Sequence, residues 1–130
     1  KFKPTRTDAD WLCSDTEALD QYLSDPLVRK NISASLFHEL LGSMKRTGKA
    51  ENYVGWNKEM PVLLLYGTED PVGDSGKGVP RLYDLMKKGG LQAVDCRQFP
   101  GARHDIFHEE AGGTAESLRN CIADWLLGRK

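Results

Sequence analysis

The sequence predicts an α/β fold in which two helices precede a strand–helix–strand–helix unit. Residues 62–66 are a short, wholly apolar run ending at Gly67, as expected of a buried strand. Residues 93–99 have strand length again, after a segment with helical spacing. From Thr114 the chain returns to the spacing of an amphipathic helix packed on a sheet. This alternation of strand and helix indicates an α/β protein.

The first half of the chain has two helical patterns. Asp15 is placed to cap a helix over residues 16–23, and Ser33 is placed to cap a second helix that Gly48 ends. The second helix is expected to carry its large apolar side chains on one face: Leu36, Phe37, Leu40, Leu41 and Met44. These helices lie before a change of composition around residues 56–61.

The second half of the chain alternates between strand and helix. Residues 62–66 predict a strand buried on both faces, and residues 78–88 predict a helix that tolerates Pro80 near its start. After the strand at residues 93–99, Thr114 is expected to cap the last helix. The apolar face of that helix is predicted to contain Leu118, Cys121, Ile122, Trp125 and Leu126.

Two parallel strands joined by a helix do not make a stable sheet by themselves, because such sheets are buried on both sides. We therefore expect further strands from a preceding part of the polypeptide, from a second copy, or from antiparallel pieces that the pattern does not reveal. The isolated chain is predicted to self-associate.

The composition describes a folded domain without a strong electrostatic preference. The 130 residues are 39% hydrophobic and carry a formal net charge of -1, with the two signs well mixed. This balance gives no reason to expect nucleic acid or an acidic membrane as a partner, and no apolar segment approaches the roughly 18 residues of a membrane span. The three cysteines are odd in number and have no C-x-x-C spacing, so we expect reduced, buried thiols and a cytoplasmic protein.

Asp70 and His104 are the candidate catalytic residues, because each follows a predicted strand, where open α/β sheets build their sites. A histidine with an ordinary pKa of about 6.5 can take up and return a proton near neutral pH. A carboxylate on its other ring nitrogen fixes the tautomer and stabilises the imidazolium. A hydrolase built on this pair needs a nucleophile, and these residues contain no Gly-x-Ser-x-Gly, so we expect the serine upstream.

Three stretches of the chain carry a family resemblance. The first contains Arg6-Thr7, Asp10-Trp11-Leu12-Cys13-Ser14-Asp15, Tyr22 and Asp25-Pro26. The second contains Gly67-Thr68-Glu69-Asp70-Pro71-Val72-Gly73-Asp74 and Gly76-Lys77-Gly78-Val79. The third is Phe99-Pro100-Gly101-Ala102-Arg103-His104, followed by an acidic residue and then by Glu109. Together they resemble the later half of the α/β-hydrolase domain in the serine aminopeptidase S33 branch, which includes lysophospholipase-like and monoacylglycerol-lipase-like enzymes.

The resemblance implies a fold, a division of the chain and a function. Residues 1–57 would be helices of the cap region, and residues 58–130 would be the C-terminal strand–helix–strand–helix part of a mostly parallel hydrolase sheet. Asp70 and His104 would be the acid and the base of a Ser-Asp-His triad in an enzyme that cleaves carboxylic esters, such as lysophospholipids or monoacylglycerols. Peptide bonds are an alternative within the family. No cofactor or metal is implied, and the isolated chain is expected to be inactive.

Other functions also fit parts of the sequence. His104 and His108 have the spacing of the zinc-binding H-E-x-x-H motif, but Asp105 stands where that motif has Glu. The run Gly73-Asp74-Ser75-Gly76-Lys77 is similar to the sequence around the nucleophile of chymotrypsin-like proteases, although the αβ pattern does not fit a β-barrel. A phosphate loop at Gly76-Lys77 lacks the required earlier glycine. A noncatalytic binding or scaffolding module on a hydrolase framework remains the alternative from another class, and an upstream Gly-x-Ser-x-Gly would separate the two.

Overall fold

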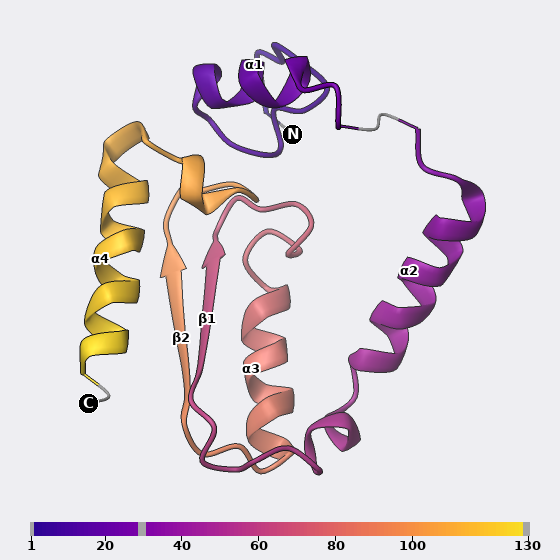
Figure 1. The fold of residues 1–130 in the computed structure, drawn as a ribbon, viewed down its shortest axis with the longest axis vertical. Coiled ribbons are helices and arrows are strands. Elements are labelled where there is room, and N and C mark those ends of the chain that lie inside the picture. The colour runs from indigo at the N-terminus through magenta and orange to yellow at the C-terminus, as the bar shows by residue number, and fades with distance from the viewer. Residues whose placement is uncertain (1, 29–30, 129–130) are drawn as a thin grey trace.

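The computed structural model describes residues 2–28 and 31–128, and it shows a parallel pair of strands between two helices (Figure 1). Strand β1 (Val62–Gly67) pairs with β2 (Val94–Phe99) in a register that sets Val62 beside Val94 and Gly67 beside Phe99. Helix α3 (Gly78–Lys88) covers one face of the pair, and α4 (Thr114–Leu127) covers the other. The predicted strand–helix–strand–helix order is confirmed.

Alternate side chains of the strands pack into two separate cores. On the α3 side, Val62, Leu64 and Val94 pack with Met86 and Leu91. On the α4 side lies a second cluster of buried residues: Phe99, Ala102, Ile106 and Leu118, with Leu65, Cys121 and Ile122 packed against it. This alternation follows from the two-residue period of a strand, which sends successive side chains to opposite faces.

Strand β1 is less buried than its sequence predicts. Each residue from Val62 to Tyr66 is half-buried, and only Gly67 is fully buried. Among the described residues β1 has one partner strand, because the sheet consists of β1 and β2. A strand needs neighbours on both edges and helices over the whole of both faces to be fully buried.

Helix α4 begins differently from the prediction. Thr114 is its first residue, and Gly113 takes the capping position without a side-chain hydrogen bond. Gly112 and Gly113 both have positive φ, of 65° and 74°, a conformation that glycine adopts without steric cost. The expected apolar face is only partly formed, since Leu118 is fully buried and Leu126 is 58% exposed.

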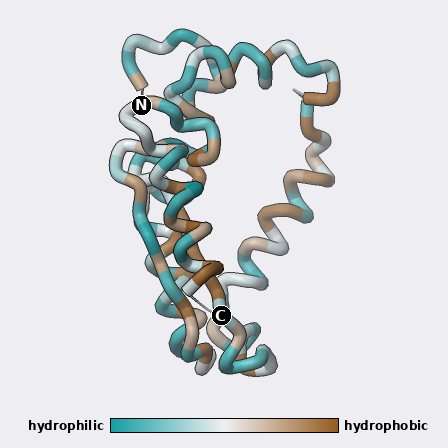
Figure 2. Tube along the Cα trace, turned by 60° about the vertical axis from the view of Figure 1, so that its left-hand side comes forward, coloured by the Kyte–Doolittle hydropathy of each residue, from teal (hydrophilic) through white to brown (hydrophobic). Residues whose placement is uncertain are grey.

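Two helices precede the sheet. Asp15 caps α1 (Thr16–Ser24) by accepting a hydrogen bond from the amide of Ala18, and Ser33 caps α2 (Ala34–Thr47), as predicted. Helix α2 stands apart from the sheet in both views of the backbone, and hydrophobic and hydrophilic residues alternate along it (Figures 1 and 2). It contains no buried residue.

A short segment joins α2 to the sheet. The 3-10 helix Ala50–Tyr53 contributes Tyr53, only 5% exposed, to the core on the α3 side. The ammonium group of Lys58 donates hydrogen bonds to the carbonyls of Tyr53 (3.0 Å) and Gly89 (2.8 Å). The division of the chain near residue 57 stays a prediction.

Candidate active site

The two predicted site residues meet at the C-terminal edge of the sheet. Because β1 and β2 are parallel, the loops that follow them leave from the same edge. Asp70 lies in the loop after β1, and His104 lies in the loop after β2. The Nδ1 atom of His104 is 3.0 Å from Oδ2 of Asp70. Local sequence patterns therefore identified two side chains that the fold brings into hydrogen-bonding contact.

A close approach of the two loops makes this contact. The amide of Thr68 donates to the carbonyl of Phe99 (3.1 Å), and the amide of Glu69 donates to the carbonyl of Ala102 (2.9 Å), so the pairing continues beyond the strands. Gly67 lies at the tightest point, where a Cβ atom would be 2.2 Å from the carbonyl oxygen of Ala102. Only a residue without a side chain fits this position.

Asp70 is held by its own loop. The residue is 8% exposed, and its Oδ1 accepts a hydrogen bond from the amide of Val72 (2.8 Å). Its backbone carbonyl accepts from the amide of Ser75 (2.7 Å). These bonds fix the carboxylate and leave Oδ2 to face His104.

The side chain of His104 is partly exposed to solvent. Its side chain is 42% exposed, whereas that of Asp70 is 12% exposed. With Nδ1 directed at Asp70, the Nε2 atom has no hydrogen-bond partner among the described residues. An imidazole in this setting can accept a proton at Nε2 while a carboxylate stabilises the charge from the other side.

The segment before α1 packs against His104 through Trp11 and Leu12. The amide of His104 donates to the carbonyl of Trp11 (3.4 Å), and the amide of Asp105 donates to the carbonyl of Leu12 (2.7 Å). The indole of Trp11 also packs against the imidazole, with ring centroids 5.4 Å apart and an interplanar angle of 42°. Residues far apart in the sequence thus share one site.

The side chain of Arg103 binds the same segment. Its guanidinium donates to the carbonyls of Asp10 (2.5 Å) and Cys13 (3.0 Å) and lies 4.1 Å from the centre of the Phe2 ring. Asp10 in turn accepts hydrogen bonds from the hydroxyl of Thr7 (2.6 Å) and the amide of Arg6 (2.7 Å), and these bonds lower the pKa of its carboxyl group.

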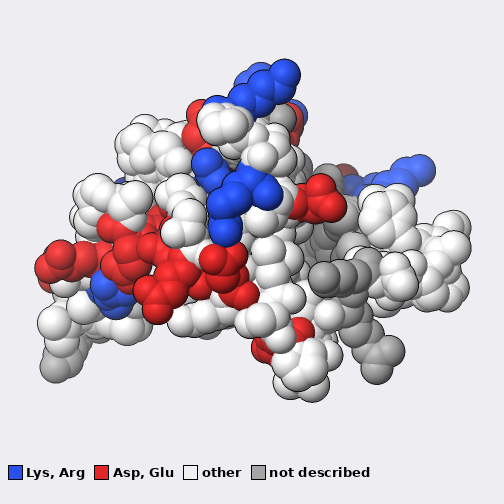
Figure 3. All heavy atoms as spheres, turned by 90° about the horizontal axis from the view of Figure 1, so that it is seen from above, with Lys and Arg blue, Asp and Glu red and all other residues white. Residues whose placement is uncertain are grey.

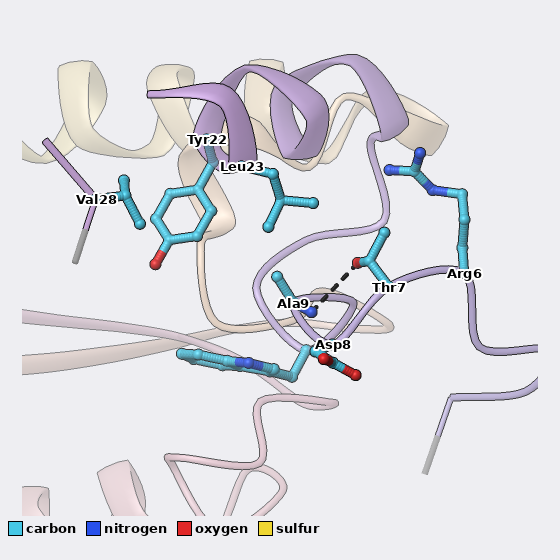
Figure 4. A pocket seen from close by; sticks show the side chains of 8 residues that line it. Arg6, Thr7, Asp8, Ala9, Tyr22, Leu23 and Val28 are labelled. Atoms are coloured by element: carbon cyan, nitrogen blue, oxygen red, sulfur yellow. Dashed lines mark hydrogen bonds between the residues drawn. The ribbon is translucent and has the colours of Figure 1, made fainter. Parts of the chain in front are cut away.

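A pocket of about 630 Å³ lies between the segment that precedes α1 and α1 itself (Figure 4). Tyr22 and Leu23 line it from α1, with Val28 from the chain that follows, and Arg6, Thr7, Asp8 and Ala9 line it from the preceding loop. Trp11 contributes to its wall and also contacts His104. Trp11 therefore lies between the pocket and His104.

The end of the molecule that carries the site is rich in acidic side chains. Figure 3 views this end and shows a broad acidic area with fewer basic groups. Residues 1–30 contain six acidic residues (Asp8, Asp10, Asp15, Glu17, Asp20 and Asp25) and five basic ones (Lys1, Lys3, Arg6, Arg29 and Lys30). Arg6 is moreover paired with Asp20 at 2.7 Å.

His104 and His108, which have the spacing of the zinc-binding motif, are not arranged to bind one zinc ion. His108 binds Oδ2 of Asp105 through Nδ1 at 2.7 Å, whereas His104 faces Asp70. Residues Ile106–His108 form a single 3-10 turn rather than the α-helix that the motif requires. Within residues 2–28 and 31–128, no group of three or more His, Cys, Asp and Glu side chains is arranged to hold a metal ion.

The three cysteines are free. Cys13 is buried, and Cys96 and Cys121 are half-buried, so only one of them is as buried as predicted. Burial raises the pKa of the Cys13 thiol, and the negative charge of Glu109 raises it further. No helix in the described part of the chain is both long and apolar enough to cross a membrane.

Comparison with known proteins identifies the family. The model of the serine aminopeptidase S33 family matches residues 1–111. The chain belongs to this family. Among curated proteins, the S33 chain is 26% identical over 96 residues to the monoglyceride lipase of Saccharomyces cerevisiae, covering 69% of this chain and 29% of the yeast protein.

Two solved structures share the fold of the S33 chain. The crystal structure of Paleococcus ferrophilus monoacylglycerol lipase matches 95% of this chain and 44% of its own, with 30% identity and a TM-score of 0.76. A highly thermostable carboxyl esterase from Bacillus coagulans, solved in complex with glycerol, matches 98% of this chain and 41% of its own, with 21% identity and a TM-score of 0.82. The S33 chain thus has part of an α/β-hydrolase fold and spans less than half of each of these relatives.

The contacts of three residues at the site were not predicted from the sequence. Trp11, Arg103 and Glu109 occur in the stretches that carry the resemblance, but no local pattern indicated what they contact. Glu109 is 3% exposed and bonds to Ser14, which lies 95 positions earlier. A contact of that separation leaves no periodic signal in a single sequence.

Proposed function

We propose that the S33 chain supplies the acid, Asp70, and the base, His104, of a Ser-Asp-His triad in an enzyme that hydrolyses carboxylic esters. The observation that carries this proposal is the 3.0 Å contact between Nδ1 of His104 and Oδ2 of Asp70, with Nε2 left open. The relatives of the family are lipases and an esterase. The serine and the oxyanion hole would belong to residues upstream of this chain.

The proposed chemistry uses both ring nitrogens of His104. As the serine oxygen attacks the ester carbonyl, Nε2 takes the hydroxyl proton and becomes part of an imidazolium. Asp70 stabilises that charge through Nδ1. The imidazolium then gives the proton to the leaving alcohol, and a water molecule repeats the sequence to release the acid. No cofactor takes part in these steps.

The pocket near the pair favours a lipid ester. Tyr22, Leu23 and Val28 offer apolar surface to an acyl chain in the pocket beside Trp11. Monoacylglycerols are the first choice, because two of the relatives are named as a monoglyceride lipase and a monoacylglycerol lipase, with lysophospholipids as the second choice. The free thiols support a reducing, cytoplasmic location.

A fluorophosphonate probe tests whether the complete protein is a serine hydrolase. An activated serine attacks such a probe and becomes covalently labelled, so we expect the complete protein to be labelled and its His104→Ala variant to be labelled far more slowly. The His38→Ala variant is the matched control, because His38 lies exposed on α2, and it should be labelled like the unchanged protein. Absence of labelling, together with absence of an upstream Gly-x-Ser-x-Gly, would favour the noncatalytic binding module.

A further inference from the structure

We propose that Glu109 is a positioning residue that holds the His104 loop against the segment at residues 10–14. This inference rests on the proposed function of His104 as a base. It adds a buried carboxylate that does not touch the reacting atoms and is separate from the Asp70–His104 pair.

The contacts of Glu109 divide between the two segments. Its Oε1 accepts a hydrogen bond from the amide of Arg103 at 2.9 Å, directly before His104. Its Oε2 accepts from the amide of Ser14 at 3.0 Å and from the hydroxyl of Ser14. The carboxylate therefore adds a side-chain bridge between two stretches of chain that the bonds of Arg103, His104 and Asp105 also join.

The bridge lies next to the backbone of His104. Trp11 and Leu12 accept hydrogen bonds from the amides of His104 and Asp105, so the segment that Glu109 holds is the one that seats the histidine. The side chain of Arg103 adds two bonds to the same segment. Removing the Glu109 carboxylate breaks its bonds to Ser14 and to the amide of Arg103 together. Both segments that contact the backbone of His104 then lose a restraint.

The chemistry of the site requires a carboxylate. The three groups of the described residues that donate to the Glu109 carboxylate are neutral, and both carboxylate oxygens are used. A glutamine would present an NH₂ group to one of these donors, which leaves two donors facing each other. An aspartate is shorter by one methylene and does not span the two segments. Glu109 is 3% exposed, so water has little access to its carboxyl group.

The test compares Glu109→Gln with Glu110→Gln in the complete protein. Glu110 is the neighbouring carboxylate, but it is exposed and paired with Arg119 at the surface. We expect kcat per active site, counted with the fluorophosphonate probe, to fall roughly 10- to 100-fold in Glu109→Gln, because a displacement of about 1 Å can cost that much. KM should stay within about twofold, because Glu109 does not touch the substrate, and Glu110→Gln should behave like the unchanged protein.

A purely structural role gives a different result. A substitution that only destabilises the fold lowers the number of active sites and leaves kcat per site unchanged, and that outcome would overturn the inference. If Glu109→Gln is not recovered folded, Ser14→Ala removes the hydroxyl bond alone. We then expect a several-fold fall in kcat per site at unchanged KM, and an unchanged kcat would overturn the inference.

The proposed function and this inference can fail separately. Full activity in His104→Ala contradicts the proposed function itself. An inactive His104→Ala together with a fully active Glu109→Gln contradicts only the positioning role. The Nδ1–H signal of His104 in the NMR spectrum of the complete protein gives a readout besides activity. We expect it to broaden in Glu109→Gln and not in Glu110→Gln.

Discussion

Gly67 shows how closely the two loops of the site approach each other. A Cβ atom at this position would lie 2.2 Å from the carbonyl oxygen of Ala102 and 2.3 Å from that of Arg103, the residue before His104. Both contacts are with backbone, so no side chain can turn away to relieve them. The glycine thus connects the end of β1 directly to the geometry of the histidine loop.

We predict that Gly67→Ala destabilises the complete protein by about 1–3 kcal/mol, the usual cost of forcing an extra methyl group into a packed site. The midpoint of urea unfolding measures this change. Gly55→Ala is the control, because a Cβ there meets nothing within 4 Å. Equal midpoints for the two variants would show that the loops can separate without cost.

Asp10 links stability to pH. Hydrogen bonds from Thr7 and Arg6 lower the pKa of its carboxyl group below the ordinary value of 3.8. Folding therefore favours the charged form, and this contribution to stability is present above about pH 4 and is lost as the pH falls through the lowered pKa of the folded state.

The Asp10→Asn variant should show less of this pH dependence. We expect it to be less stable than the unchanged protein at pH 7, and the difference in unfolding free energy should shrink as the pH falls below about 4. Denaturant unfolding at a series of pH values measures the difference. Asp8→Asn, at an exposed neighbouring position, provides the comparison. A difference that is constant from pH 7 to acid conditions would contradict the assignment.

At the scale of elements, β1 and α2 leave apolar surface uncovered. The residues of β1 from Val62 to Tyr66 are only half-buried. The apolar face predicted for α2 is exposed along its length, with each of its five large side chains between 50% and 59% exposed: Leu36, Phe37, Leu40, Leu41 and Met44. Contiguous apolar surface of this kind is covered in a stable protein.

The isolated chain should therefore self-associate. We expect sedimentation at micromolar concentration to show species larger than a 14.5 kDa monomer. Replacing Leu40 and Leu41 by Gln should weaken the association if α2 contributes to it. The matched change of the exposed polar residues Ser35 and Glu39 to Gln should leave it unchanged. A monomer throughout this concentration range would contradict the prediction.

The elements also show what a single sequence can reveal. Helix α3 has the predicted bounds, because Gly89 and Gly90 mark its end, and the caps Asp15 and Ser33 form as predicted. The start of α4 was misplaced because the left-handed Gly113 competes with Thr114 for the capping position. The contact of Glu109 with Ser14 depends on the folded loops rather than on any local pattern.

At the scale of the whole molecule, the chain has part of an α/β-hydrolase fold. It covers 44% of the length of the Paleococcus ferrophilus lipase. It contains the edge of the sheet at which Asp70 and His104 meet, together with the helices that cover its two faces. In the proposed enzyme, the remaining sheet would cover β1 and deliver the serine to Nε2. The activity would then belong to the complete protein and not to this chain alone.

The most direct test is the hydrolysis of a medium-chain monoacylglycerol by the complete protein and by its His104→Ala variant. A triad that loses its base retains only the contributions of binding and the oxyanion hole, so we predict a fall in kcat of several orders of magnitude. His38→Ala should retain full activity, since His38 lies on the exposed surface of α2. If His104→Ala hydrolyses the ester as fast as His38→Ala, His104 is not the base and the proposed function is wrong.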